Sequence, residues 1–333
     1  MTDTRYDVIG LGNAIVDVIA RADEAFLAKH DLAKGSMHLI GPAQADLLYS
    51  QMGPGTESSG GSAANTIAGI ASLGGSAAFA GKVADDGLGE VFTHDIRALG
   101  VGFDTAPLDS GAATGRCLVL VTPDGERTMN TFLGAAQELG PADIDEEMVA
   151  ASRMLYLEGY LWDPENAKQA FVKAAEIAKT AGREVVLTLS DAFCVERYRD
   201  EFLELIRSGT IDMVFANEHE VRSLYQTGDL ATAMDALGGE ARSAVITRGA
   251  EGATIFNTGS RVDVPCEPVA RVVDLTGAGD LYAAGFLFAK ARGMTPEECG
   301  RLAAICASEV ISHVGARPQV NLADLARENG FPI

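Results

Sequence analysis

The sequence is short of aromatic side chains, of basic side chains and of long apolar runs. Phe, Trp and Tyr make up 6% of its 333 residues, with one Trp among them. Lys and Arg number 26 against 47 Asp and Glu, so the formal net charge is −21. Such a surface repels phosphodiester backbones and anionic lipids, which argues against nucleic-acid and membrane partners. No apolar run reaches the ~18 residues of a membrane-spanning helix. A local site for a small anionic ligand is still compatible with this charge.

Cysteines at the spacing of a metal or redox site are also lacking. The cysteines are five in number, and no two of them are separated by two residues: Cys117, Cys194, Cys266, Cys299 and Cys306. The odd count predicts reduced thiols. The first residues, "MTDTRYDVIGLG", have no basic flank followed by a long apolar core, so we expect no signal peptide and a cytoplasmic protein.

Apolar residues, by contrast, make up 47% of the chain. Along the sequence their spacing changes repeatedly between the pattern of a strand and the pattern of a helix. Runs typical of strands lie at 6–12, 76–83, 153–160, 184–190, 211–217 and 243–249. Between them, helical spacing is found at 62–74, 166–182, 218–225 and 283–293. Alternating strands and helices predict an α/β fold, with a central, mostly parallel sheet and helices on both of its faces.

Two segments interrupt this alternation. Residues 14–22 with 36–41, and residues 115–133, read as strands without intervening helices, and Asp124-Gly125 predicts a hairpin in the second segment. We expect a small β-sheet lid over one edge of the main sheet, inserted from about 14–41 and 112–135. No tandem repeat or low-complexity linker is present, so residues 1–333 are predicted to form a single domain.

Two glycine patterns resemble nucleotide motifs but fail in detail. Gly10 and Gly12 follow a strand as in a dinucleotide fingerprint, but Ile15 stands where the third glycine belongs. Five residues separate Gly75 from Gly81, whereas a phosphate-binding loop has four, and Val83 replaces its Ser or Thr. Neither pattern supports a dehydrogenase or a P-loop enzyme.

The stretch "VVDLTGAGDLYAAGF" (272–286) carries the strongest chemical signal. Its small residues form a turn, an acid follows, and an apolar helical pattern comes next. Backbone N–H groups of such a turn and of a helix start attract a transferring phosphoryl group. Asp280 is then in place to accept the proton of an attacking hydroxyl. The alternative interpretation is that Asp280 only caps a helix.

Two motifs together resemble a known family. "DLTGAGD" (274–280) is similar to the second signature of the ribokinase/PfkB superfamily of small-molecule kinases, and "SGGSAANTIAGIASLG" (59–74) is similar to the first. The resemblance implies a ribokinase-like fold, with Asp280 as catalytic base and with an anion hole formed by Gly277, Ala278 and Gly279. Leu275 departs from the family pattern, which usually has a small residue there.

The resemblance also implies ATP and Mg²⁺, and it leaves potassium activation open. "ANEHE" (216–220) resembles the N-x-x-E motif, in which Asn217 and Glu220 hold magnesium through water; a plain helix start is the alternative. "ITRGAEGA" (246–253) resembles the segment along the nucleotide, and the ATP-binding residues would be Thr247, Gly249, Gly252, Gly277 and Gly279. Ala304 stands where many members have a larger polar residue.

The acceptor is expected to be a nucleoside. "GLGNAIVDV" (10–18) resembles the adenosine kinase branch, and its Asn13 and Asp17 would bind the ribose. The other residues that the resemblance places around the acceptor are Gly61, Ser62 and Asn65 beside the sugar, and Leu133, Ala135 and Tyr160 beside the base.

Two other functions remain open at this stage. A sugar kinase acting on ribose, fructose or a related sugar is the first, because Glu158 adds a charge that a purine pocket does not need. The second is a catalytically silent nucleotide-binding regulator. In each case the expected partner is a small molecule, and the chain is expected to be a monomer or a homodimer.

Overall fold

The computed structural model describes residues 4–333 and contains two sheets. Eight strands form the larger sheet in the order β13-β12-β11-β10-β9-β8-β1-β5, and only the β11–β12 and β12–β13 pairings are antiparallel. Its strands are β1 (Tyr6–Leu11), β5 (Ala77–Ala80), β8 (Ser152–Glu158), β9 (Glu184–Thr188), β10 (Met213–Asn217), β11 (Ser243–Thr247), β12 (Ala253–Asn257) and β13 (Ser260–Val264).

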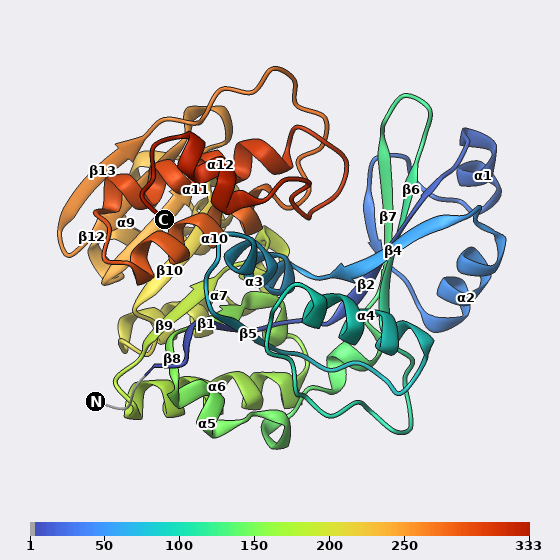
Figure 1. Cartoon of the computed structure of the whole chain (residues 1–333), viewed down its shortest axis with the longest axis horizontal. Helices are drawn as coiled ribbons and strands as arrows, with labels where there is room; N and C mark the ends of the chain where they lie inside the picture. The colour runs from blue at the N-terminus through green and yellow to red at the C-terminus, as the bar shows by residue number, and fades with distance from the viewer. Residues whose placement is uncertain (1–3) are drawn as a thin grey trace.

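Helices cover both faces of this sheet (Figure 1). One face carries α3 (Ser62–Ser72), α4 (Gly87–Ala98), α10 (Ala278–Ala291), α11 (Pro296–Val310) and α12 (Leu322–Glu328). The other carries α5 (Glu146–Ala150), α6 (Glu165–Thr180), α7 (Ala192–Arg207), α8 (Glu218–Tyr225) and α9 (Leu230–Glu240). The predicted α/β fold, with helices on both faces of a mostly parallel sheet, is confirmed.

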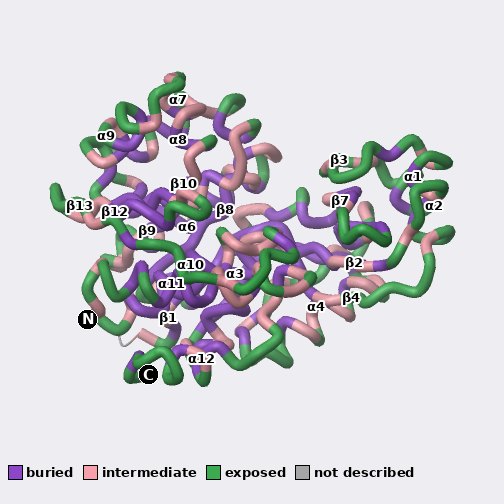
Figure 2. The backbone as a smooth tube through the Cα atoms, turned by 90° about the horizontal axis from the view of Figure 1, so that it is seen from above, coloured by how far each residue is buried: buried purple, intermediate pink, exposed green. Residues whose placement is uncertain are grey.

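Strand β8 shows how the sequence produces these two layers. Met154 and Tyr156 pack against the first group of helices, whereas Leu155 and Leu157 pack against the second. Successive side chains of a strand point to opposite faces, so a strand covered on both sides needs a continuous apolar run. In Figure 2 the buried residues accordingly follow the sheet through the centre of the molecule.

The second, smaller sheet stands beside the main one (Figure 1). Its strands follow the order β3-β7-β6-β2-β4. They are β2 (Ile15–Arg21), β3 (Met37–Leu39), β4 (Gly55–Gly60), β6 (Gly115–Val121) and β7 (Arg127–Phe132). Two helices, α1 (Glu24–Lys29) and α2 (Pro42–Gln51), cover its outer face through Leu27 and Leu48. The predicted hairpin joins β6 to β7 at Gly125, which has a φ of +87°.

Three further segments are 3-10 turns that follow strands or precede helices: η1 (Gly134–Glu138), η2 (Pro141–Asp143) and η3 (Gly159–Trp162). A fourth, η4 (Gly249–Glu251), lies between β11 and β12. Among residues 4–333, no helix is both long enough and apolar enough to cross a membrane.

The interpretation of the small sheet from sequence was wrong in two respects. Helix α1 separates β2 from β3, because the Asp23 side chain accepts from the N–H of Phe26 and caps a short helix. Strand β4 was also missed, because "GTESSG" has few residues that favour strands. Pairing with β2 along its whole length holds this segment extended.

Candidate active site

The N-termini of α3 and α10 meet at the centre of the site. Each helix follows a glycine in the left-handed region, Gly61 with φ +101° and Gly277 with φ +80°. The two helices pack so tightly that a Cβ on Gly69 would lie 2.7 Å from Ala284 Cβ. Because free N–H groups give each helix start a partial positive charge, two such starts together favour an anion.

Asp280 lies in the first turn of α10 and is held by the first signature motif. Ser62 Oγ donates to Asp280 Oδ1 at 2.7 Å, and Asn65 Nδ2 donates to Oδ2 at 3.0 Å. Burial raises the pKa of Asp280, while these two hydrogen bonds and the charge of Arg317 oppose the rise. The carboxylate is therefore oriented and basic, as a proton acceptor must be.

Asp17 approaches the same centre from strand β2 of the small sheet. A Cβ on Gly60 would lie 2.5 Å from the Asp17 carboxyl group, so a side chain there would displace that group. Burial raises the pKa of Asp17 to about 6; Arg317 and Arg127 lower it and Asp280 raises it. The charges of the two carboxylates, one on β2 and one on α10, therefore interact.

Asn13 is fixed beside them by Glu158. Asn13 Nδ2 donates to Glu158 Oε1 at 2.8 Å, and the N–H of Ala63 donates to Glu158 Oε2 at 2.9 Å. Burial raises the pKa of Glu158 to about 7. A Cβ on Gly61 would lie 2.1 Å from the carbonyl oxygen of Asn13. The structure therefore brings Asn13, Asp17, Gly61, Ser62, Asn65 and Asp280 together.

The residues predicted to contact a nucleobase follow the ends of two strands, β7 and β8. Leu133 is half-buried just after β7, and Ala135 is buried in η1 with its N–H donating to Ala113. Tyr160 is half-buried in η3, after β8. Burial and then the nearby Asp191 carboxylate raise the pKa of Tyr160. Among residues 4–333, no hydrogen bond joins Tyr160 to Leu133 or Ala135.

A cavity of about 490 Å³ lies on the other side of the α10 start. Five of the residues predicted to bind ATP or to form the anion hole line it: Thr247, Gly249, Gly252, Ala278 and Gly279. A Cβ on Gly279 would meet nothing within 4 Å, so the backbone there faces open space. Leu275 and Ala304, the two departures from the family pattern, belong to its mainly apolar wall. Because a helix start favours an anion, this cavity is the candidate site for a phosphate-bearing ligand.

The pair predicted to hold magnesium is a helix cap. Asn217 Oδ1 accepts from the N–H of Glu220, and Glu220 Oε2 accepts from the N–H of Asn217 at 2.9 Å. Burial raises the pKa of Glu220 to about 7. Within residues 4–333, no group of three or more Asp, Glu, His or Cys residues could hold a metal directly. A magnesium ion here fits only through water and phosphate oxygens.

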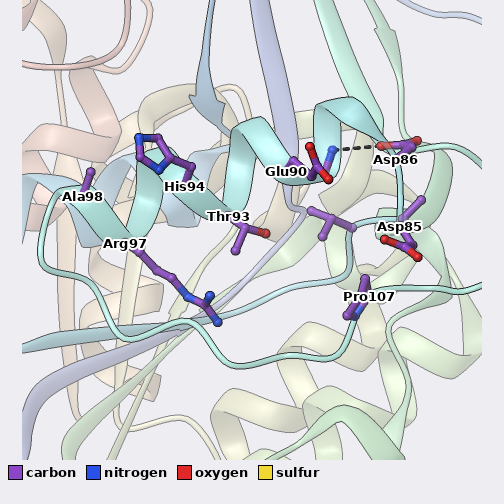
Figure 3. Close-up of a pocket in the computed structure, with 11 residues that line it drawn as sticks. Asp85, Asp86, Glu90, Thr93, His94, Arg97, Ala98 and Pro107 are labelled. Atoms are coloured by element: carbon purple, nitrogen blue, oxygen red, sulfur yellow. Dashed lines mark hydrogen bonds between the residues drawn. The ribbon is translucent and has the colours of Figure 1, made fainter.

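Another cavity, of about 580 Å³, lies along α4 (Figure 3). Its lining includes Glu90, His94 and Arg97, and none of it belongs to either signature motif. Arg97 is already engaged with the carbonyl oxygen of Phe103, and Asp86 caps α4 through the N–H of Gly89. Because the α10 cavity, unlike this one, is lined by residues of the second signature, we place the chemistry at the α10 cavity.

Comparison with known proteins agrees with this geometry. The sequence pattern of the pfkB family carbohydrate kinases matches residues 34–322. The chain belongs to this family. PfkB family members are phosphotransferases that use an alcohol group as acceptor, so this chain is a kinase of a sugar or nucleoside.

Three PfkB relatives show the range of similarity. The structure of adenosine kinase from Sinorhizobium meliloti is 54% identical, with a TM-score of 0.92 over 98% of this chain and 100% of that one. A probable sugar kinase from Rhizobium etli is 49% identical, with a TM-score of 0.91 over 98% and 99%. Adenosine kinase from Saccharomyces cerevisiae is 26% identical over 86% of this chain and 89% of its own length.

Two arginines of this PfkB kinase were missed from sequence. Arg127, on lid strand β7, has its Nη1 2.6 Å from Asp274 Oδ2 at the start of the second signature. Its Nε and Nη2 are buried and have no hydrogen-bond partner in the part of the chain that the structure describes. Arg317 contacts the first signature from the segment after α11. A lone arginine in a strand or loop has no pattern that marks it as functional.

Proposed function

We propose that the protein transfers the γ-phosphoryl group of ATP to a primary hydroxyl of a nucleoside, with adenosine giving AMP as the main reaction. One observation carries the proposal: Asp280 lies between the acceptor-side group around Asp17 and the cavity lined by Ala278 and Gly279. A base between an acceptor and a nucleotide is the arrangement that direct transfer requires.

In this mechanism Asp17 accepts hydrogen bonds from the sugar hydroxyls and orients the acceptor. Asp280 takes the proton of the primary hydroxyl while its oxygen attacks the γ-phosphorus. The bond from that phosphorus to the β-γ bridging oxygen breaks, and ADP leaves with the electron pair. The backbone of Gly277, Ala278 and Gly279 stabilises the negative charge of the transferring group.

Arg127 supplies a further positive charge. Its two unpartnered nitrogens are buried, and an anion that binds near them would satisfy both. Thr247, Gly249 and Gly252 would lie along the nucleotide. Magnesium, held through water by Asn217 and Glu220, would neutralise part of the phosphate charge; magnesium and potassium both stay predictions.

The inner face of the lid favours a nucleoside over a free sugar. Strand register places Leu39 on the same face as Asp17, through pairing with Thr131 and Cys117. Met37 lies on that face beside Met129. Met37 and Leu39 are 48% and 60% exposed, and a nucleobase would cover such apolar surface. A free sugar offers nothing apolar to cover it.

The adenosine kinase of Sinorhizobium meliloti supports the same acceptor class. The probable sugar kinase of Rhizobium etli keeps a sugar acceptor as the second candidate. Against it, both carboxylate oxygens of Glu158 are already bonded to Asn13 and Ala63, so Glu158 has no need of a sugar hydroxyl.

One assay separates these candidates. ADP release is measured with adenosine, inosine, guanosine, ribose and fructose as separate acceptors. The proposal predicts the highest kcat/KM with adenosine. A higher value with ribose or fructose would make the protein a sugar kinase, and no ADP release with any acceptor would favour a silent regulator.

A further inference from the structure

Three consecutive residues after α11 contact both signature motifs. The N–H of Gly315 donates to Asp274 Oδ2 at 3.0 Å. Ala316 packs against Gly277 so closely that a Cβ on Gly277 would lie 2.8 Å from Ala316 Cα. Arg317 reaches in the opposite direction, to the first signature. This segment therefore joins the phosphate side of the site to the acceptor side.

The Arg317 guanidinium binds the backbone on both sides of the glycine turn of the first signature, at Ser59 and at Ala64. Nε and Nη2 donate to the carbonyl oxygen of Ser59 at 3.1 and 2.8 Å, and Nη2 also donates to Ser59 Oγ at 2.8 Å. Nη1 donates to the carbonyl oxygen of Ala64 at 3.0 Å. Between these anchors lie Gly61 and Ser62, which contact Asn13 and Asp280.

All of these acceptors are neutral oxygens. Within the described residues, no carboxylate lies within ion-pair distance of Arg317, so no direct partner cancels its charge. Burial lowers the pKa of Arg317 to about 10, while Asp95, Asp17 and Asp280 raise it. The side chain therefore stays protonated at neutral pH and acts on several carboxylates at once.

We propose that Arg317 is a positioning residue for phosphoryl transfer: it holds in shape the turn 59–64, which contacts Asp17 through Gly60 and Asp280 through Ser62, and it brings to that turn a positive charge that no direct partner cancels. This inference rests on the proposed roles of those two acids. Two neighbouring carboxylates disfavour each other's ionised form, and a positive charge near both removes that conflict. Arg127 lowers the pKa of Asp17 less than Arg317 does, because Arg127 is paired directly with Asp274.

The surroundings of the two acids agree with this role. After burial, the charge of Arg317 has the largest effect on the pKa of Asp17, and it lowers that pKa. Arg317 is also the charged group that lowers the pKa of Asp280. The other charged and titratable groups that face these acids come from four elements: Cys117 on β6, Arg127 on β7, Tyr156 and Glu158 on β8, and Asp95 on α4.

Asp95 weakens the electrostatic effect of Arg317 on Asp17 and Asp280. Its Oδ2 accepts from the N–H and Oγ of Ser59 at 2.7 and 2.6 Å, so Ser59 connects Asp95 to the guanidinium. The negative charge of Asp95 offsets part of the positive charge that Asp17 and Asp280 experience. Neutralising Asp95 therefore has the opposite effect from neutralising Arg317.

The direct test is a carboxyl ¹³C NMR titration of the full chain labelled at aspartate, with signals assigned through D17N and D280N. In R317M we expect the midpoints of Asp17 and Asp280 to rise by about one pH unit. R317K keeps the charge and should stay close to the wild-type midpoints. The matched control is R327M, because Arg327 is an exposed arginine paired with Asp324. Unchanged midpoints in R317M would overturn the inference.

D95N tests the inference independently, including the case in which R317M does not fold. It should lower both midpoints, and a rise or no change would contradict the role of Arg317. The kinetic counterpart is a kcat at pH 7 that falls several-fold in R317M and recovers at pH 9, with the KM for ATP unchanged. An inactive wild type would contradict the proposed function alone, because the titration midpoints are read without turnover.

Discussion

Ser62 Oγ donates a 2.7 Å hydrogen bond to Oδ1 of Asp280, which joins the first residue of α3 to the first turn of α10. The two residues are 218 positions apart, one in each signature motif. Their contact means that the two motifs form a single site, in which the first motif orients the carboxylate of the second.

Alanine substitutions at Gly279 and Gly277 should affect different properties, phosphate binding in the first case and stability in the second. G279A places a methyl group in the open cavity, where the proposed phosphates pass, without any clash in the protein. It should keep or slightly increase stability and lower kcat/KM for ATP at least 10-fold. G277A forces a φ of +80° on alanine and meets Ala316, so it should cost more than about 1–2 kcal/mol of unfolding free energy. Urea unfolding and ADP assays of both variants check this.

The raised pKa of Asp17 predicts the pH at which kcat/KM declines on the acidic side of its pH profile. Its pKa of about 6 lies above the ordinary 3.8, so the charged form that accepts sugar hydroxyls is lost as the pH falls through 6. The plot of log kcat/KM against pH should decline below about pH 6. The folded state binds this proton more tightly than the unfolded chain, so the contribution of Asp17 to stability decreases as pH rises from 3.8 to about 6.

D17N checks that assignment. It should raise the KM for the acceptor about 100-fold and leave the KM for ATP close to the wild-type value, because Asp17 lies on the acceptor side. An acidic limb in the wild type below pH 5 would show that Asp17 titrates like an exposed aspartate.

Arg127 and Asp274 form a buried ion pair between the lid and the second signature. R127M leaves the Asp274 carboxylate buried with only its bonds to Thr276 and Gly315, so we expect a loss of about 3–5 kcal/mol of unfolding free energy. The double variant R127M/D274N should recover part of this loss, because no uncompensated charge remains. Denaturant unfolding of the four proteins measures the coupling. Additive losses would mean that the pair contributes nothing as a pair.

A substitution of Leu39, on the inner face of the lid, tests whether the acceptor is a nucleoside. L39S should raise the KM for adenosine about 10-fold and leave the KM for ribose unchanged, because a base covers this side chain and a sugar does not. Since Leu39 is 60% exposed, stability should change little. L47S on α2, where Leu47 is 47% exposed on another element, is the matched control. Equal effects of the two substitutions on adenosine would contradict a base-binding face.

The sequence predicted the layers of the fold because its apolar periodicity changes with each element. The small sheet was predicted less completely: β4 has few strand-forming residues and is held as a strand by pairing with β2. Helix α1 is six residues long and depends on the Asp23 cap, a signal too local to stand out.

For the site, the glycine motifs were visible because close backbone approach requires glycine, as Gly61 beside Asn13 shows. The ion pair of Arg127 and the hydrogen bonds of Arg317 to Ser59 could not be predicted. Each joins segments far apart in the chain, and a single charged residue has no periodicity. Asn217 and Glu220 were selected by their spacing, and the structure shows how that spacing also makes a helix cap.

The measurement that tests the central claim most directly is the turnover of D280N with adenosine and ATP, with nucleotide affinity measured on the same preparation by calorimetry. Since the carboxamide cannot accept the hydroxyl proton, the account predicts that kcat falls at least 1,000-fold while the Kd for ATP stays within a few-fold of the wild type. A D280N protein that retains a kcat within 10-fold of the wild type would contradict the assignment of Asp280 as the base.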